Sequence, residues 1–236
     1  VSIFHYKNLI KHLPEDLTIY GVQAPFEPEE QIRPLTELYL KEIRKLYPDG
    51  AYYLGGYCFG GIVAYDMAVV LEKQGTPPKG LFVIELSFAE LIRFRPRYLW
   101  AIFREENLWQ HTVRMTNKVL KILNRLTRAV IPGEKGFKDE AKDYYDTSLL
   151  PETTRHRTEV HFRAARDYKP EKYQGEIVVI ACDTVYSRRD PDVGWDRLID
   201  DPKKRHIYHN VSDHHSILEE PYVIEVADAI VKHLDQ

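Results

Sequence analysis

The feature that most constrains the fold is the glycine-rich turn Gly56-Tyr57-Cys58-Phe59-Gly60, which stands between a short apolar run and a long helical pattern. The run at 51–55 reads as a buried strand, and 62–74 has the apolar spacing of a helix that ends at Gly75. A strand that turns into a helix at Gly-x-Cys-x-Gly raises the central side chain above the sheet, at the positive end of the helix dipole. The pattern therefore predicts an α/β fold with a candidate nucleophile, Cys58.

Strand and helix patterns alternate along the rest of the chain. Such alternation is typical of a mostly parallel central sheet with helices on both faces. Further strands are expected at 17–23, 81–86, 176–182 and 206–211, and further helices at 6–13, 32–47, 153–165 and 221–234.

One segment departs from this alternation. Residues 91–130 show helical spacing and no strand pattern, so 91–165 is interpreted as a helical lid inserted into a single domain that spans 1–236. Residues 93–128 hold nine basic and two acidic side chains, a net charge of +7. The first residue is Val1 rather than Met, and we expect the chain to be the C-terminal piece of a longer protein.

Composition narrows the classes of partner. The chain has 33 Lys and Arg against 36 Asp and Glu, which gives no global electrostatic reason for nucleic acid or an anionic membrane as a partner. No run of about 18 apolar residues predicts a membrane span. The two cysteines favour a reducing, cytoplasmic setting. Because the paired histidines at 214 and 215 have no companion ligands at usable spacing, we expect no metal and no bound cofactor.

A nucleophile of this kind needs a general base, which in such a fold follows the last strand. His214 lies in the loop between the strand pattern at 206–211 and the closing helix. His215 is its competitor, since position alone does not separate two adjacent histidines. We expect His214 to be the base, and the N–H of Phe59, the residue after the nucleophile, to be one oxyanion donor.

The acid that orients the base has two candidates, each at the end of a predicted strand. Glu85 follows an apolar run at 81–84, and Asp183 follows the run at 177–182. An unpaired carboxylate in an apolar strand would be costly, so Glu85 calls for a partner such as an imidazolium. Glu85 is the preferred acid, with Asp183 as the alternative.

These residues together resemble the thioesterase domains of nonribosomal peptide synthetases and polyketide synthases. The similarity runs over nearly the whole chain, and its motifs include Tyr6-Lys7-Asn8-Leu9, Ile19-Tyr20-Gly21-Val22-Gln23, Tyr53-Leu54-Gly55-Gly56, Tyr168-Lys169-Pro170, Gly194-Trp195 and Asp213-His214. The resemblance implies an α/β-hydrolase fold, with Glu85 as the acid and His214 as the base. It also implies an enzyme that takes an acyl or peptidyl chain from the phosphopantetheine arm of a carrier protein and passes it to water or to an internal amine or hydroxyl.

The sequence departs from that family in three ways. Cys58 replaces the usual Ser, and Glu85 replaces the usual Asp. The loop that supplies the second oxyanion donor falls at or before Val1. Attack by Cys58 on a thioester leaves another thioester, which stays activated, so we expect transfer to an internal amine or hydroxyl, as in cyclisation, to be favoured over plain hydrolysis.

Three other functions are compatible with parts of this pattern. A hydrolase of small lactones, similar to the dienelactone hydrolases, also has Gly-x-Cys-x-Gly and would use Asp183 as its acid. A free-standing editing thioesterase would clear misprimed carrier proteins. A hydrolase fold kept only as a binding module is the non-enzymatic alternative, and the presence of both Cys58 and His214 counts against it.

Overall fold

The structure is a computed structural model that describes residues 3–24, 28–48, 50, 52–86, 152–183, 187, 190 and 192–234. The chain divides into two units, one made of 1–91 and 156–236 and the other of 92–155. The predicted lid at 91–165 and its basic stretch at 93–128 lie outside the described residues, except for 152–165, which are helical.

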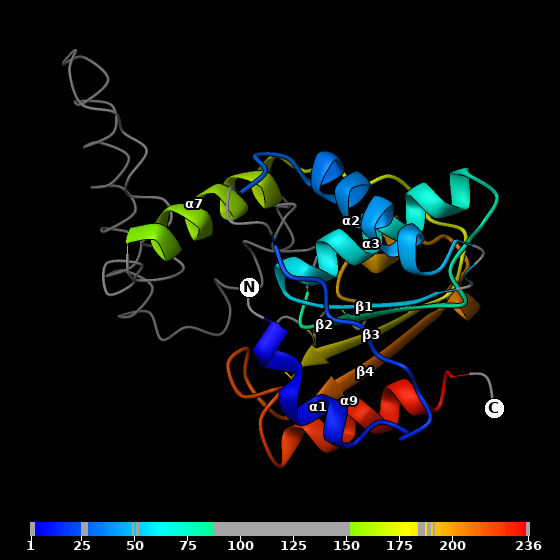
Figure 1. The fold of residues 1–236 in the computed structure, drawn as a ribbon. Helices are drawn as coiled ribbons and strands as arrows, with labels where there is room; N and C mark the ends of the chain where they lie inside the picture. The colour runs from blue at the N-terminus through cyan, green and yellow to red at the C-terminus, as the bar shows by residue number, and fades with distance from the viewer. Residues whose placement is uncertain are drawn as a thin grey trace, which may run out of the picture. The chain divides into compact units, whose positions relative to one another are not determined.

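Four parallel strands form the sheet of the described residues (Figure 1). Within β2 and β3, which are apolar almost throughout, alternate side chains enter two different core clusters, as the two-residue period of a strand requires. Both faces of the sheet must therefore be covered. The strands lie side by side in the order β1 (Tyr53–Tyr57), β2 (Gly80–Ile84), β3 (Ile177–Cys182) and β4 (Arg205–Asn210).

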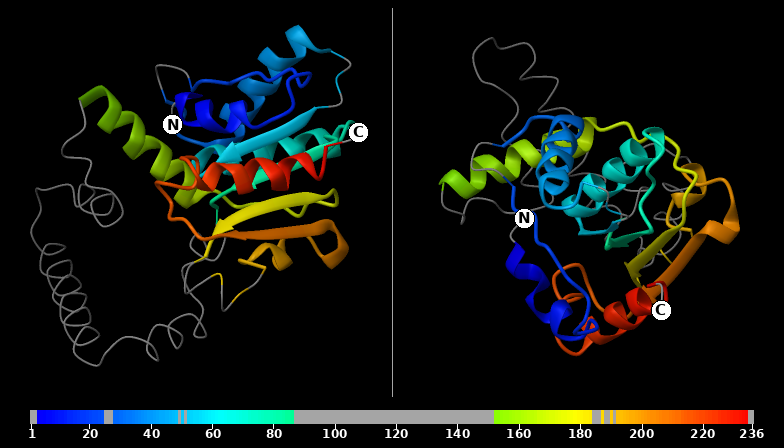
Figure 2. Two further views of the ribbon diagram at one scale, coloured as in Figure 1. Left: turned by 90° about the horizontal axis from the view of Figure 1, so that it is seen from below. Right: turned by 45° about the vertical axis from the view of Figure 1, so that its right-hand side comes forward.

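Helices cover both faces of the sheet (Figures 1 and 2). On one face α2 (Ile32–Leu46) packs on α3 (Phe59–Lys73), and α3 contacts β1 and β2. On the other face α1 (Lys7–Lys11) lies beside α9 (Tyr222–Val231), which contacts β3 and β4. The remaining elements are η1 (Ile3–Tyr6), α7 (Glu152–Asp167), η4 (Trp195–Arg197) and η5 (Pro202–Lys204).

Most of the predicted elements are confirmed. The strands predicted at 51–55, 81–86, 176–182 and 206–211 correspond to β1 to β4, with ends shifted by at most two residues. The strand predicted at 17–23 is wrong, because this segment has no regular structure and exposes Ile19, Tyr20 and Val22. A β-rich run forms a strand only where a neighbouring strand completes its hydrogen bonds. In the described part of the chain the sheet ends at β1, which pairs with β2 alone.

One buried carboxylate ties α2 to α3. Asp66 of α3 is completely buried and accepts two hydrogen bonds from the Arg33 guanidinium, at 2.8 and 2.9 Å, and one from the Tyr168 hydroxyl at 2.9 Å. Burial and the Asp66 charge raise the pKa of Tyr168 above its ordinary value. A buried carboxylate is tolerated only when such partners satisfy its oxygens.

We predict that Arg33→Met lowers the free energy of unfolding by about 2 to 4 kcal/mol, because it leaves the Asp66 charge buried with less compensation. Urea titration measures the loss. The matched control is Arg44→Met, which removes another α2 guanidinium, one that bonds the exposed Gln74 side chain and should cost less than about 1 kcal/mol. Equal small losses for both variants would contradict the role given to Arg33.

Candidate active site

The turn after β1 has no room for a side chain at Gly56. A Cβ atom on Gly56 would lie 2.1 Å from the carbonyl oxygen of Gly60, so only glycine fits. Cys58 adopts φ 53° and ψ −120°, a conformation that residues with a side chain rarely take. Because α3 begins at Phe59, the Cys58 side chain stands at a helix N-terminus, where unpaired N–H groups and the helix dipole favour negative charge.

The parallel register brings a carboxylate to the same edge of the sheet. Tyr57 of β1 pairs with Ile84 of β2, so the next residues of the two strands, Cys58 and Glu85, are neighbours where the strands end. The ladder continues past both strands, with the Cys58 N–H donating to the Ile84 carbonyl at 2.9 Å. Glu85 also has a positive φ, of 50°. Both candidate site residues therefore occupy strained backbone at the carboxyl edge of the sheet.

His214, in the loop after β4, links these two side chains. Its Nδ1 atom lies 3.7 Å from the Glu85 Oε1 atom, an ion-pair distance longer than a hydrogen bond. Its ring also interacts with the Cys58 side chain, which is the largest cause of its raised pKa. The Tyr57 hydroxyl donates to the His214 carbonyl, and the two rings lie 5.2 Å apart, so the loop is held against the turn.

The charges around His214 reinforce one another. Interactions with Cys58 and then with Glu85 raise the pKa of His214 to about 10, against the opposing effect of burial. Burial alone would raise the pKa of Glu85. The ion pair with His214 and the hydrogen bond from the Cys182 N–H, which is 2.7 Å from Oε2, outweigh it and hold the pKa of Glu85 below its ordinary value. The arrangement favours an imidazolium at His214 paired with the Glu85 carboxylate.

The two alternatives left open by the sequence occupy different positions. Extended from the β2–β3 register, Glu85 lies level with Ala181, whereas Asp183 lies two residues further along, and its N–H donates to the Asn210 carbonyl at 2.7 Å. Glu85 is the candidate acid whose carboxylate forms the ion pair with His214. The His215 N–H donates to the Asp213 carboxylate at 2.8 Å.

The predicted oxyanion donor is next to a histidine that the sequence did not single out. Phe59 is the first residue of α3, and its ring stacks on that of His161 in α7, with centroids 4.4 Å apart. Burial, with help from Arg157, lowers the pKa of His161 to about 4, so its ring is neutral at pH 7. In the sequence, His161 is a single histidine within a predicted helix, and nothing in that pattern marks it as part of a site. The second oxyanion donor, expected at or before Val1, lies outside the described residues.

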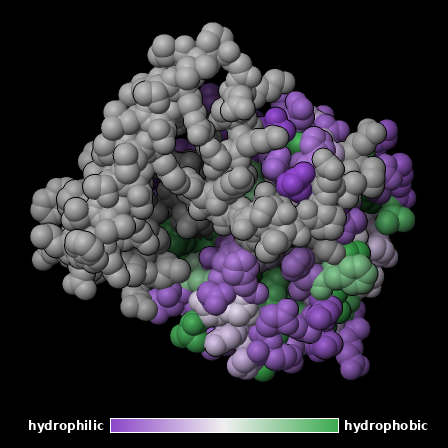
Figure 3. Space-filling model, turned by 90° about the vertical axis from the view of Figure 1, so that its left-hand side faces the viewer, coloured by the Kyte–Doolittle hydropathy of each residue, from purple (hydrophilic) through white to green (hydrophobic). Residues whose placement is uncertain are grey.

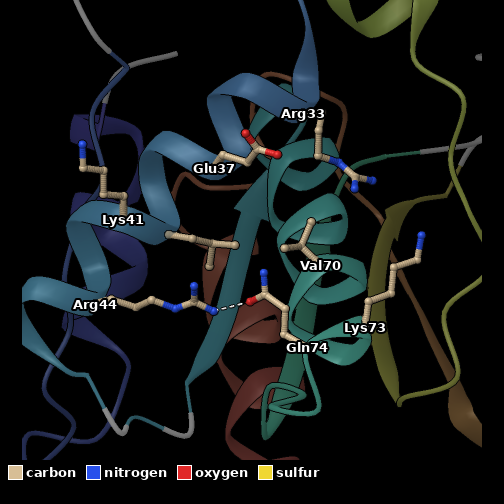
Figure 4. Close-up of a pocket in the computed structure, with 8 residues that line it drawn as sticks. Arg33, Glu37, Lys41, Arg44, Val70, Lys73 and Gln74 are labelled. Carbon is tan, nitrogen blue, oxygen red and sulfur yellow. Dashed lines mark hydrogen bonds between the residues drawn. The ribbon is translucent and has the colours of Figure 1, made fainter.

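A groove of about 560 Å³ between α2 and α3 lies away from this site (Figure 4). Arg44 and Gln74 bond across it. Its α3 residues are near the C-terminal end of that helix, about 18 to 24 Å along the axis from Cys58 at the other end. The groove therefore does not border the nucleophile. It is lined by Arg33, Glu37, Leu40, Lys41, Arg44, Val70, Lys73 and Gln74.

Several large apolar side chains are exposed on the described surface. Figure 3 shows hydrophobic side chains interrupting a largely hydrophilic lower surface. Phe4 and Ile10 are among the large apolar side chains that are exposed. Scattered residues of this kind are normal on a protein surface. In the ranges that the structure describes, no helix is long and apolar enough to cross a bilayer, and no group of three potential ligands is placed to hold a metal ion.

Comparisons with known proteins give a consistent result. The profile of the family described as thioesterase domain matches residues 2–236. Chondramide synthase cmdD of Chondromyces crocatus is 24% identical over 256 residues, which cover 98% of this chain and 6% of that protein. Malpinin synthetase of Mortierella alpina is 43% identical over 75 residues, which cover 30% of this chain and 1% of that protein. The chain thus spans only a few per cent of the length of these curated relatives.

The solved structures include holo-AB3403, a four-domain nonribosomal peptide synthetase bound to AMP and glycine. It is 25% identical to this chain, with a TM-score of 0.65. The match covers 100% of this chain and 19% of that protein, so the likeness is to one part of a larger enzyme.

We predict that the His214 ring titrates in NMR spectra with a midpoint near pH 10. Cys58→Ala should lower the midpoint most and Glu85→Gln should also lower it, whereas Asp183→Asn should not. Because the folded-state pKa is raised, these contacts stabilise the fold fully below about pH 6.5, and the contribution is lost as the pH rises through about 10. A wild-type midpoint near 6.5, or equal shifts for Glu85→Gln and Asp183→Asn, would contradict the assignment.

Proposed function

The chain belongs to the thioesterase domain family, and from that premise we propose that it takes an acyl or peptidyl chain from the phosphopantetheine arm of a carrier protein onto Cys58 and releases it. The α/β-hydrolase fold is that of solved thioesterase domains. One observation carries the proposal. Cys58 stands at the N-terminus of α3 and interacts with a His214 ring that is paired with Glu85.

The proposed acylation begins with the Cys58 thiolate. Its sulfur forms a bond to the carbonyl carbon of the thioester, and the carbonyl electron pair moves onto the oxygen, where the Phe59 N–H stabilises the charge. When the pair returns, the bond to the phosphopantetheine sulfur breaks. The leaving thiolate takes its proton from the His214 imidazolium, which Glu85 holds in place.

Deacylation reverses the role of His214. The now neutral ring accepts a proton from an incoming water, amine or hydroxyl, and that group attacks the thioester on Cys58. Collapse of the second intermediate restores the thiolate and the imidazolium. Because the acyl-enzyme is a thioester, it stays reactive towards an amine, and cyclisation through an internal amine or hydroxyl is the outcome that we favour over hydrolysis.

The proposed partner is an acyl or peptidyl carrier protein. The support for this partner is that the proteins similar to this chain include a chondramide synthase, a malpinin synthetase and a four-domain nonribosomal peptide synthetase. We also propose a cytoplasmic setting. Both cysteines of the chain are free, as a reducing compartment would keep them.

Each alternative enzyme differs from the proposed one either in its acid residue or in its substrate. A hydrolase of small lactones of the dienelactone type would use Asp183 as its acid, and the ion pair between His214 and Glu85 favours the thioesterase instead. An editing thioesterase would use the same three side chains. It would differ in the short acyl groups that it removes from misprimed carriers.

We predict that incubation with an acyl thioester of N-acetylcysteamine, a mimic of the phosphopantetheine end, adds one acyl mass to the protein. Intact-protein mass spectrometry detects the adduct, and Cys58→Ala should abolish it because no other side chain is proposed to attack. A small lactone should give no lasting adduct. If the wild type neither forms an adduct nor turns over the thioester, the proposed function is wrong.

The cyclisation proposal predicts a change in products for Cys58→Ser. The variant would form an oxoester, which is less reactive towards amines than a thioester, so its ratio of amide to free acid should fall severalfold below that of the wild type. Chromatography of the products from a thioester that carries a terminal amine measures the ratio. The same ratio from both enzymes would contradict the proposal that the Cys58 thioester favours cyclisation over hydrolysis.

A further inference from the structure

A tyrosine from the first helical turn lies against the loop that carries the candidate nucleophile. The Tyr6 hydroxyl, at the end of η1, accepts a hydrogen bond from the Tyr57 N–H at 2.9 Å. A Cβ atom on Gly60 would lie 3.1 Å from the same oxygen. Tyr57 and Gly60 bracket Cys58 in the chain, and Tyr6 and Cys58 pack against the same core cluster. The hydroxyl is therefore held at the turn, on the edge of β1 that no described strand covers.

The hydroxyl keeps a proton that it can donate. A phenol has one O–H donor besides its acceptor lone pairs. The Tyr57 N–H donates to a lone pair of the Tyr6 oxygen, which leaves the O–H available to donate. No residue in the described part of the chain accepts the Tyr6 proton. Burial raises the pKa of Tyr6, the Tyr57 N–H lowers it and the charge of Cys58 raises it again, with a net shift upward. The phenol is thus protonated across the neutral range, at the turn that carries Cys58.

We propose that the Tyr6 hydroxyl donates a hydrogen bond to the oxyanion that forms when Cys58 attacks the acyl carbonyl. The inference rests on the proposed function and adds a side-chain donor to the backbone N–H of Phe59. As the Cys58 sulfur bonds to the carbonyl carbon, the electron pair on the oxygen takes this hydrogen bond. The bond is released when the pair re-forms the carbonyl and the phosphopantetheine thiolate leaves with the His214 proton. Tyr6 keeps its own proton throughout.

The test replaces the hydroxyl and keeps the ring. With Tyr6→Phe, we expect the single-turnover rate of Cys58 acylation to fall about 100-fold with little change in KM, the usual effect of losing one oxyanion donor. The affinity for a substrate-derived aldehyde, which adds to Cys58 and places an oxygen where the oxyanion forms, should fall by a similar factor. The control is Tyr20→Phe, which removes an exposed hydroxyl and should change neither value.

A purely structural role for Tyr6 gives a different result. Tyr6→Phe would then lower the melting temperature through the lost bond to Tyr57, while the acylation rate and aldehyde affinity of the folded protein stay within about twofold of wild type, and the inference would be overturned. If the wild type itself is not acylated, the proposed function fails first, so the two failures are distinguishable.

A second variant tests the same inference in case Tyr6→Phe does not fold. A fluorinated tyrosine built in at position 6 keeps the ring and the hydroxyl but ionises at lower pH. Acylation should then decline above the pH at which that phenol ionises, whereas the wild type should show no such decline. Identical pH profiles for the two proteins would overturn the inference.

Discussion

The close approach of two backbone segments, at Gly56 and Gly60, is the constraint on which the rest of the site depends. Their contact leaves no space for a Cβ atom, so β1 passes into α3 within a single residue. That residue is Cys58, which accepts a positive φ of 53° as a result. Stabilising contacts elsewhere offset this backbone strain, because α3 is buried along most of its length and its Asp66 is bonded to Arg33.

The parallel sheet then determines what surrounds the sulfur. Adjacent strands end at one edge, so a residue just past β2 lies beside a residue just past β1. The loop after β4 folds over this edge and is held there by the Tyr57 hydroxyl. Interactions with Cys58 and then with Glu85 raise the pKa of His214 to about 10, so its ring carries a proton at neutral pH. The proposed acyl transfer uses this position and this protonated state of His214.

The sequence was sufficient for the elements with strong local signals. The turn at Cys58, the histidine after the last strand and the four strands all follow from glycine placement and apolar runs. Glu85 was preferred to Asp183 from the sequence although both follow apolar strands, and its ion pair with His214 supports that preference. The strand expected at 17–23 was wrong because strand formation depends on a partner that local pattern does not reveal. Tyr6 was noted only as part of a helix motif, since its contact with Tyr57 joins residues 51 positions apart.

The most direct test of the account uses a carrier protein whose phosphopantetheine arm holds a labelled acyl chain. Rapid quenching, followed by proteolysis and mass spectrometry, locates the label over time. The account predicts that the label leaves the carrier, passes through the peptide that contains Cys58 and then appears in released product, with no transfer in Cys58→Ala. Release from the carrier at the wild-type rate by Cys58→Ala, with no label on that peptide in either protein, would contradict it.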